Sequence, residues 1–151
     1  MDNCEDSNSD FTLSKSEILR GYNSFYYVLQ NSKTISTEYL KAFVNKQVTD
    51  TAVTEFNKSP LFTGNVKVGF IIAKKKIKKS VKRNRIKRLF KESYRLTKTQ
   101  TCLFGLKLNI IFTLNDKGYM LFQNNKKIKT EFLKNEMILL SSKINLKYSS
   151  L

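Results

Sequence analysis

The spacing of apolar residues divides the chain into helical and extended segments. Within residues 23–31, the apolar members of FYYVL recur at helical intervals, which predicts a short helix. Residues 39–44 (YLKAFV) are rich in apolar and aromatic side chains and predict a strand. Residues 45–65 hold the single proline and a Gly-Asn pair, so we expect a loop or a loose hairpin there.

The second half of the chain continues this mixture. The apolar run 66–73 (VKVGFIIA) predicts a buried strand, and the alternating run 106–114 (LKLNIIFTL) predicts another. Asp116-Lys117-Gly118 is typical of a turn, and residues 119–122 are interpreted as a short further strand. A closing helix is predicted from the apolar residues Leu133, Met137, Leu140 and Ile144.

Apolar and cationic residues separate on a helix that we expect to begin near Ser80, a residue type favoured at helix N-caps. At about 100° per residue, one half of the helical wheel holds Val81, Ile86, Leu89, Phe90, Ser93 and Leu96. The other side holds Asn84, Lys87, Arg88, Lys91 and Arg95. The pattern predicts an amphipathic helix whose polar face is almost entirely cationic.

Positive charge is concentrated in this same part of the chain. Residues 74–98 contain thirteen Lys or Arg against one acid, Glu92, which is a net charge of +12 out of +16 for the protein. Cations at this density repel one another unless a polyanion lies on them, and nucleic acid is the commonest such partner.

Length and composition indicate one folded domain. The chain has 151 residues with 40% hydrophobic content, enough for a single core. Residues 1–10 carry four acids and no base and are predicted to be a disordered tail, which leaves 11–151 as the domain. No apolar run is long enough to cross a bilayer and the N-terminus lacks signal-peptide character, so we expect a cytoplasmic protein with no membrane partner.

The absence of certain residue types excludes several chemistries. The chain has no histidine, which removes the usual general acid and base near neutral pH and the commonest zinc ligand. A protein-only ribonuclease with two catalytic histidines is therefore excluded. Cys4 and Cys102 have no motif spacing and are interpreted as idle thiols.

The segment from Gly69 to Arg95 resembles the signature of the bacterial ribonuclease P protein subunit. In that family a strand ends in Ser/Ala-Lys-Lys, and after a short linker an Arg-Asn-Arg helix continues with Lys-Arg. The corresponding residues here are Ala73-Lys74-Lys75, Arg83-Asn84-Arg85 and Lys87-Arg88. About 27 residues match at the level of the motif, and the order of the other elements fits more weakly.

The resemblance implies a fold and a function. The expected fold is α+β, a two-layer α/β sandwich of the kind named after the second domain of a small-subunit ribosomal protein. It would have a four-stranded mixed sheet, three helices and a left-handed βαβ crossover. The implied function is that of the non-catalytic protein subunit of an endoribonuclease. A catalytic RNA, using Mg²⁺ held mainly by the RNA and its substrate, removes the 5′ leader of precursor tRNA. The implied partners are that RNA and precursor tRNA, and no protein partner is evident.

The resemblance also implies site residues, all of them binding and none catalytic. RNA contact falls on Lys74, Lys75, Arg83, Asn84, Arg85, Lys87, Arg88, Lys91 and Arg95. Arg suits phosphate oxygens and base faces, and Lys tolerates imprecise phosphate geometry. A cleft for the leader falls on Phe25, Leu29 and Phe43, where aromatic faces could stack on bases. Any metal site on the protein is unknown.

Plainer interpretations of the same residues stand beside these. A run of cations is usually a solvated helix face, but the near absence of acids removes the i,i+4 pairs that such faces show. Lys74 and Lys75 could protect a sheet edge. Phe25 and Leu29 are equally expected as core residues, and either Tyr26 or Tyr27 could replace them in the cleft. Glu92 is expected to pair with Arg88 or Arg95.

Two other functions would also explain a basic domain. A ribosomal-protein-like module would share the charge and the affinity for RNA but would confer no cleavage. A self-sufficient nuclease would need clustered carboxylates to hold metal ions, and the acids are scattered: Asp50, Glu55, Asp116, Glu131 and Glu136.

Overall fold

A computed structural model describes residues 17–46, 66–101, 107–124 and 128–149. The four helices are α1 (Tyr22–Gln30), α2 (Ser80–Thr101), α3 (Asp116–Asn124) and α4 (Thr130–Ser149). The four strands are β1 (Lys33–Ser36), β2 (Leu40–Lys46), β3 (Lys67–Phe70) and β4 (Leu108–Leu114). The acidic tail, both cysteines and most of the expected loop 45–65 lie outside the described residues.

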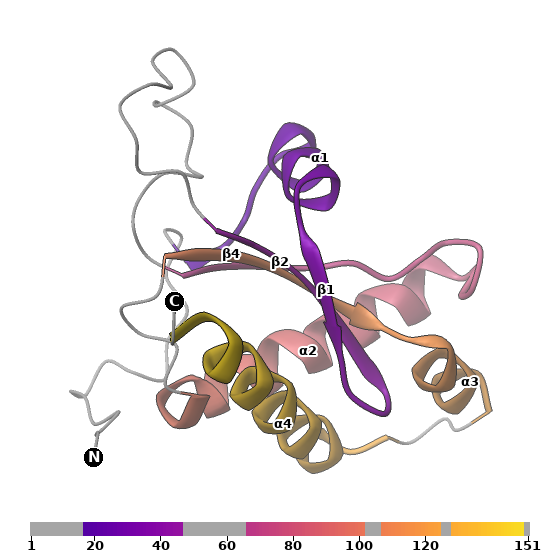
Figure 1. The fold of residues 1–151 in the computed structure, drawn as a ribbon. Coiled ribbons are helices and arrows are strands. Elements are labelled where there is room, and N and C mark those ends of the chain that lie inside the picture. The colour runs from indigo at the N-terminus through magenta and orange to yellow at the C-terminus, as the bar shows by residue number, and fades with distance from the viewer. Residues whose placement is uncertain (1–16, 47–65, 102–106, 125–127, 150–151) are drawn as a thin grey trace.

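The strands form one mixed sheet in the order β1-β2-β4-β3. β1 and β2 are antiparallel, as are β2 and β4, whereas β3 runs parallel to β4 and is joined to it through α2. The order β3, α2, β4 is thus a βαβ unit. Helices α2 and α4 lie together against one face of the sheet, and α1 lies on the other face (Figure 1). The α+β fold class is confirmed, with four helices where three were expected.

The principal core lies between the sheet and the pair α2 and α4. Alternate residues of the strands face it, among them Phe70 of β3 and Phe112 of β4. Their rings are stacked with centres 5.9 Å apart, and the rings of Phe70 and Phe90 of α2 are stacked with centres also 5.9 Å apart. Removing a fully buried ring such as Phe90 would cost about 3–5 kcal/mol. This side of α2 is therefore fixed against the sheet, and its cations are held outward.

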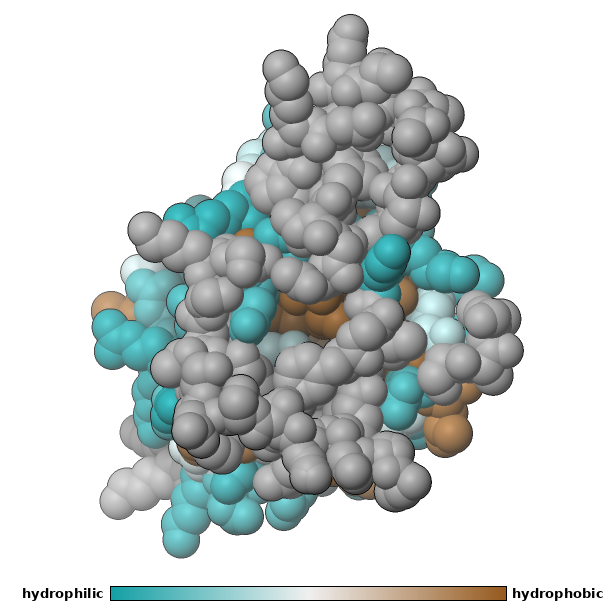
Figure 2. Space-filling model, turned by 90° about the vertical axis from the view of Figure 1, so that its left-hand side faces the viewer, coloured by the Kyte–Doolittle hydropathy of each residue, from teal (hydrophilic) through white to brown (hydrophobic). Residues whose placement is uncertain are grey.

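A smaller apolar cluster lies on the opposite face of the sheet. Leu19, Val28 of α1 and Ile111 of β4 are buried there. The segment before α1 runs beside β3, because Ile18 bridges Val68 in parallel and the Leu19 N–H donates to the Val68 carbonyl at 2.8 Å. Figure 2, which views the side at the left of Figure 1, shows hydrophobic side chains near the centre and hydrophilic ones among the described residues around them.

The structure corrects several predicted elements. Residues 45 and 46 belong to β2 rather than to a loop, and the strand predicted at 66–73 ends at Phe70. The short strand β1 was missed, because its pattern KTIS is mostly exposed and carries one apolar residue. Val81 was placed on the apolar side of its helix but is 79% exposed, since the first turn of α2 extends beyond the core.

The largest correction concerns residues 116–122, which form α3 and not a turn followed by a strand. Asn115 caps this helix: its Oδ1 accepts from the Gly118 N–H at 2.9 Å, and the Tyr119 N–H donates to the Asn115 carbonyl. Gly118 is required by close approach, because a Cβ there would collide with the Tyr39 carbonyl. An Asn cap followed by Tyr119 and Phe122 at helical spacing was the signal for this helix.

Candidate nucleic-acid interface

The basic turn after β3 is held from α3. The Ala73 N–H donates to the Tyr119 hydroxyl at 2.8 Å, and the Gln123 Nε2 donates to the Lys76 carbonyl at 2.6 Å. Lys76 also lies 3.5 Å from Asp116 in an exposed ion pair. Lys74 and Lys75 are exposed in this turn. Helix α3 therefore fixes the backbone from which these two lysines project.

Arg83, the first residue of the Arg-Asn-Arg motif, binds the backbone of the linker (residues 76–79) that leads into α2. Its Nη1 donates to the carbonyls of Ile77 and Lys78 at 2.9 and 2.8 Å. A charged donor shared by two carbonyls strongly orders the backbone. The structure thus gives Arg83 a positioning role that the sequence alone did not indicate.

A groove of about 340 Å³ lies between the polar side of α2 and residues near the N-terminal end of the described chain. On one side lie Asn84, Lys87, Arg88 and Lys91 of α2. On the other lie Ile18, Leu19, Phe25, Gly69 and Phe70. We call this the β3-edge groove, because β3 is the outer strand of the sheet at this point. It joins four predicted RNA-binding residues to one residue of the predicted leader cleft.

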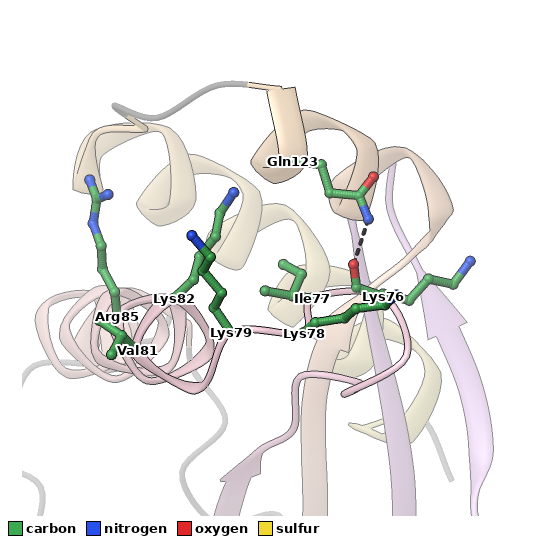
Figure 3. A pocket seen from close by; sticks show the side chains of 8 residues that line it. All are labelled: Lys76, Ile77, Lys78, Lys79, Val81, Lys82, Arg85 and Gln123. Carbon is green, nitrogen blue, oxygen red and sulfur yellow. Dashed lines mark hydrogen bonds between the residues drawn. The ribbon is translucent and has the colours of Figure 1, made fainter.

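The other predicted contacts separate from this groove. Arg85 lines a different pocket, together with the linker 76–79 and Gln123 (Figure 3). Arg95 forms an ion pair with Glu92 at 2.6 Å, so the expected pairing of Glu92 with Arg95 is confirmed. The hydrogen bonds that Arg95 donates to the Glu92 carboxylate also raise the pKa of Arg95. Arg85 and Arg95 therefore do not line the β3-edge groove.

The predicted leader cleft is only partly brought together. Phe25 and Phe43 both pack against the small cluster of Leu19, Val28 and Ile111. The Lys41 Nζ lies 5.7 Å from the centre of the Phe43 ring, which places a cation beside an aromatic face. Leu29 is 40% exposed and does not join this cluster.

The two tyrosines that could serve in the cleft differ in their packing. Tyr27 packs against the same cluster as Phe25 and Phe43. Tyr26 is 54% exposed and stacks instead on Tyr22, with ring centres 6.1 Å apart. Tyr27, and not Tyr26, therefore lies with the other aromatic residues of the candidate cleft.

Gly69 is a site residue that sequence reasoning missed. A Cβ at this position would come within 2.7 Å of two atoms of the Phe25 ring. The ring therefore packs directly against the backbone of Gly69, which has no side chain. The signal was present in VKVGF, because a glycine inside a strand often marks the close approach of another group.

Carboxylates are sparse around these residues. Glu92 and Asp116 are each paired with a cation, and the described ranges contain no group of three Asp, Glu, Cys or His residues that could hold a metal ion. Among the described helices, none combines the length and the apolar composition needed to span a bilayer.

Comparison with known proteins identifies the family. The family model named Ribonuclease P matches residues 13–137, a span that includes α1, the whole sheet and the basic helix. The chain belongs to the Ribonuclease P family.

Individual relatives agree with membership of the Ribonuclease P family. The ribonuclease P protein component of Chlorobium phaeobacteroides is 36% identical over 107 residues, which is 71% of this chain and 61% of that protein. The solved RNase P protein of Thermotoga maritima superposes with a TM-score of 0.61 at 18% identity and covers 84% of this chain and 96% of that one. The RNase P protein of Staphylococcus aureus gives 0.58 at 15% identity, with 89% and 99% covered. At these identities the two structures show a shared fold.

Proposed function

We propose that this chain is the protein subunit of ribonuclease P. In this role it binds the catalytic RNA and the 5′ leader of precursor tRNA, and it supports removal of the leader in tRNA maturation. The proposal rests on membership of the Ribonuclease P family and on the β3-edge groove. We also propose that the protein acts in the cytoplasm.

The groove carries the proposal because it joins two chemistries that single-stranded RNA needs. Lys87, Arg88 and Lys91 offer three cations to phosphates, and within the described residues none of them is engaged in an ion pair. Phe25 offers an aromatic surface on the opposite side of the groove. Charge supplies affinity through counterion release, and stacking on an aromatic ring adds about 1–3 kcal/mol per base without sequence preference.

The bond-breaking chemistry is assigned to the RNA. Mg²⁺ would be held mainly by the RNA and its substrate, where it would activate water and stabilise the leaving oxygen. The protein residues would position the leader and screen phosphate repulsion. The scattered carboxylates of this chain favour this assignment over a nuclease that works alone.

Cleavage of precursor tRNA tests the proposal directly. The assay is run at low Mg²⁺ with the full-length protein alone, the cognate catalytic RNA alone, and both together. We expect cleavage at the mature 5′ end only with both. If the protein binds the RNA without restoring cleavage, the ribosomal-protein-like function gains support; if the protein cleaves alone, the chemistry is misassigned.

A further inference from the structure

A second basic pocket lies on the side of α2 that does not face the β3-edge groove. It has a volume of about 510 Å³, and its cations are Lys76, Lys78, Lys79, Lys82 and Arg85. Lys79, Lys82 and Arg85 extend in the same direction, with Gln123 of α3 across from them (Figure 3). We call this the linker pocket, because residues 76–79 line it. It shares no lining residue with the β3-edge groove.

Most of the positive charge of the linker pocket is uncompensated by acidic residues. Lys76 at its margin is already paired with Asp116. None of the other four cations forms an ion pair with another residue in the part of the chain that the structure describes. No acidic residue lines the pocket. Four such cations around one pocket complement a ligand with more than one negative charge.

The linker pocket also has apolar surface, which a simple phosphate site does not need. Val81 of α2 is 79% exposed and supplies this surface, whereas Ile77 lines the pocket but is only 4% exposed because it packs in the main core. Val81 is the one large apolar side chain that is exposed among the described residues of α2. A flat apolar group placed against it would remove this surface from water.

Gln123 adds a directional group at the margin. Its Nε2 is committed to the Lys76 carbonyl at 2.6 Å, which orients the amide and leaves the Oε1 as an acceptor. Flat apolar surface, uncompensated cations and one amide acceptor together match the base, phosphate and exocyclic amino group of a nucleotide. An acidic peptide could satisfy the same groups, but the proposed function supplies RNA as the partner.

We propose that the linker pocket binds one unstacked nucleotide of the ribonuclease P RNA. The base lies against Val81, and the flanking phosphates lie among Lys79, Lys82 and Arg85. Because the pocket and the β3-edge groove share no lining residue, we expect this nucleotide to be distinct from those in the groove. The identity of the RNA in this inference rests on the proposed function.

Site-directed crosslinking in the assembled complex tests the location. A cysteine-free full-length protein (Cys4→Ser, Cys102→Ser) receives a single cysteine, Val81→Cys or Lys91→Cys, that carries an azidophenacyl group. We expect the probe at position 81 to react with a defined unpaired nucleotide, and the probe at position 91 to react with other nucleotides. A position-81 probe that reacts with nothing, or with the same nucleotides as position 91, overturns the inference.

A double-mutant cycle tests the contact with the base. Val81→Asn should weaken RNA binding about tenfold because the base loses its apolar surface. Leu139→Asn is the matched control, since Leu139 is also exposed but lies on α4. Removing the base of the crosslinked nucleotide should weaken RNA binding by the wild-type protein about as much as Val81→Asn does. The same abasic RNA should bind the Val81→Asn variant almost as well as the intact RNA does.

The outcomes separate this inference from the proposed function. Equal abasic penalties in the wild type and in Val81→Asn would mean that the base does not contact the pocket and would overturn the inference alone. Tight binding of an acidic peptide that RNA does not displace would also overturn it. If the wild type fails to bind the RNA at all, the proposed function itself fails.

Discussion

Helices α1 and α2 both reach the β3-edge groove, but they bring opposite chemistry to it. α1 has no acid or base in its nine residues, whereas the 22 residues of α2 hold eight cations and one acid. α1 contributes the ring of Phe25, and α2 contributes Lys87, Arg88 and Lys91. Contacts from α2 should therefore depend steeply on salt, and contacts from α1 should depend on it little.

The largest effect is expected when α2 is made to resemble α1. The triple variant Lys87→Ala, Arg88→Ala and Lys91→Ala should lower affinity for the catalytic RNA about a hundredfold and make the log–log salt slope shallower by about two to three. The measurement is a binding titration over a range of salt. The charge-matched control replaces exposed lysines outside both pockets, Lys107, Lys129 and Lys147. An equal loss in the control would show that only net charge matters.

The next effect concerns the support of the cationic side by α3. Tyr119→Phe keeps the ring but removes the acceptor of the Ala73 N–H. We expect RNA binding to weaken about fivefold to tenfold, because an unsatisfied backbone donor loosens the turn that presents Lys74 and Lys75. Tyr148→Phe, another buried tyrosine, is the control.

A double-mutant cycle separates positioning from general destabilisation. In a Lys74→Ala, Lys75→Ala background, Tyr119→Phe should cause no further loss of RNA affinity. The same loss in both backgrounds would contradict the positioning role of Tyr119.

A smaller effect is expected on the α1 side. Gly69→Ala should displace the Phe25 ring and cost about 1–3 kcal/mol of unfolding free energy. Affinity for precursor tRNA should fall a fewfold, with an unchanged salt slope and little change for mature tRNA. Adding Phe25→Leu should recover part of the lost stability, because a smaller side chain relieves the overlap. A changed salt slope would break the proposed division between the two helices.

The smallest effect is expected when Glu92, the single acid of α2, is replaced. Glu92→Gln removes the negative charge that forms an ion pair with Arg95 and replaces the carboxylate acceptor by a weaker amide oxygen. We expect about a twofold gain in RNA affinity and only a slight loss of stability, because an exposed intrahelical pair is screened by solvent. Thermal unfolding and RNA titration measure the two quantities. A loss of RNA affinity would mean that Glu92 itself is needed for binding.

Elements with a strong periodic pattern could be predicted from the sequence. The helix expected at 23–31 is α1, and the strand expected at 39–44 lies almost entirely within β2. The amphipathic helix is α2, with Ile86, Phe90 and Ser93 buried as its pattern required. These predictions succeed because burial against one face imposes a period on the residues.

Elements defined by capping or by pairing could not be predicted in the same way. α3 depends on the Asn115 cap and on a close approach to Tyr39, and β1 depends on its pairing with β2. Neither leaves a strong hydrophobic period in a short segment. The polar residues of β4 are buried because other polar groups meet them, as when Asn109 donates to Asn45 across the sheet at 3.4 Å.

The sequence by itself determined that this protein is a basic α+β domain with an amphipathic, cationic helix and the Arg-Asn-Arg motif of its family, because charge and periodicity are local properties. Only the tertiary structure decided where each cation goes. Arg83 turns back to the linker carbonyls, Asn84 faces the groove with Phe25, and Arg85 lines the pocket beside Gln123. Three adjacent residues on a helix point in three directions about 100° apart, so what each one meets depends on the element packed against that side.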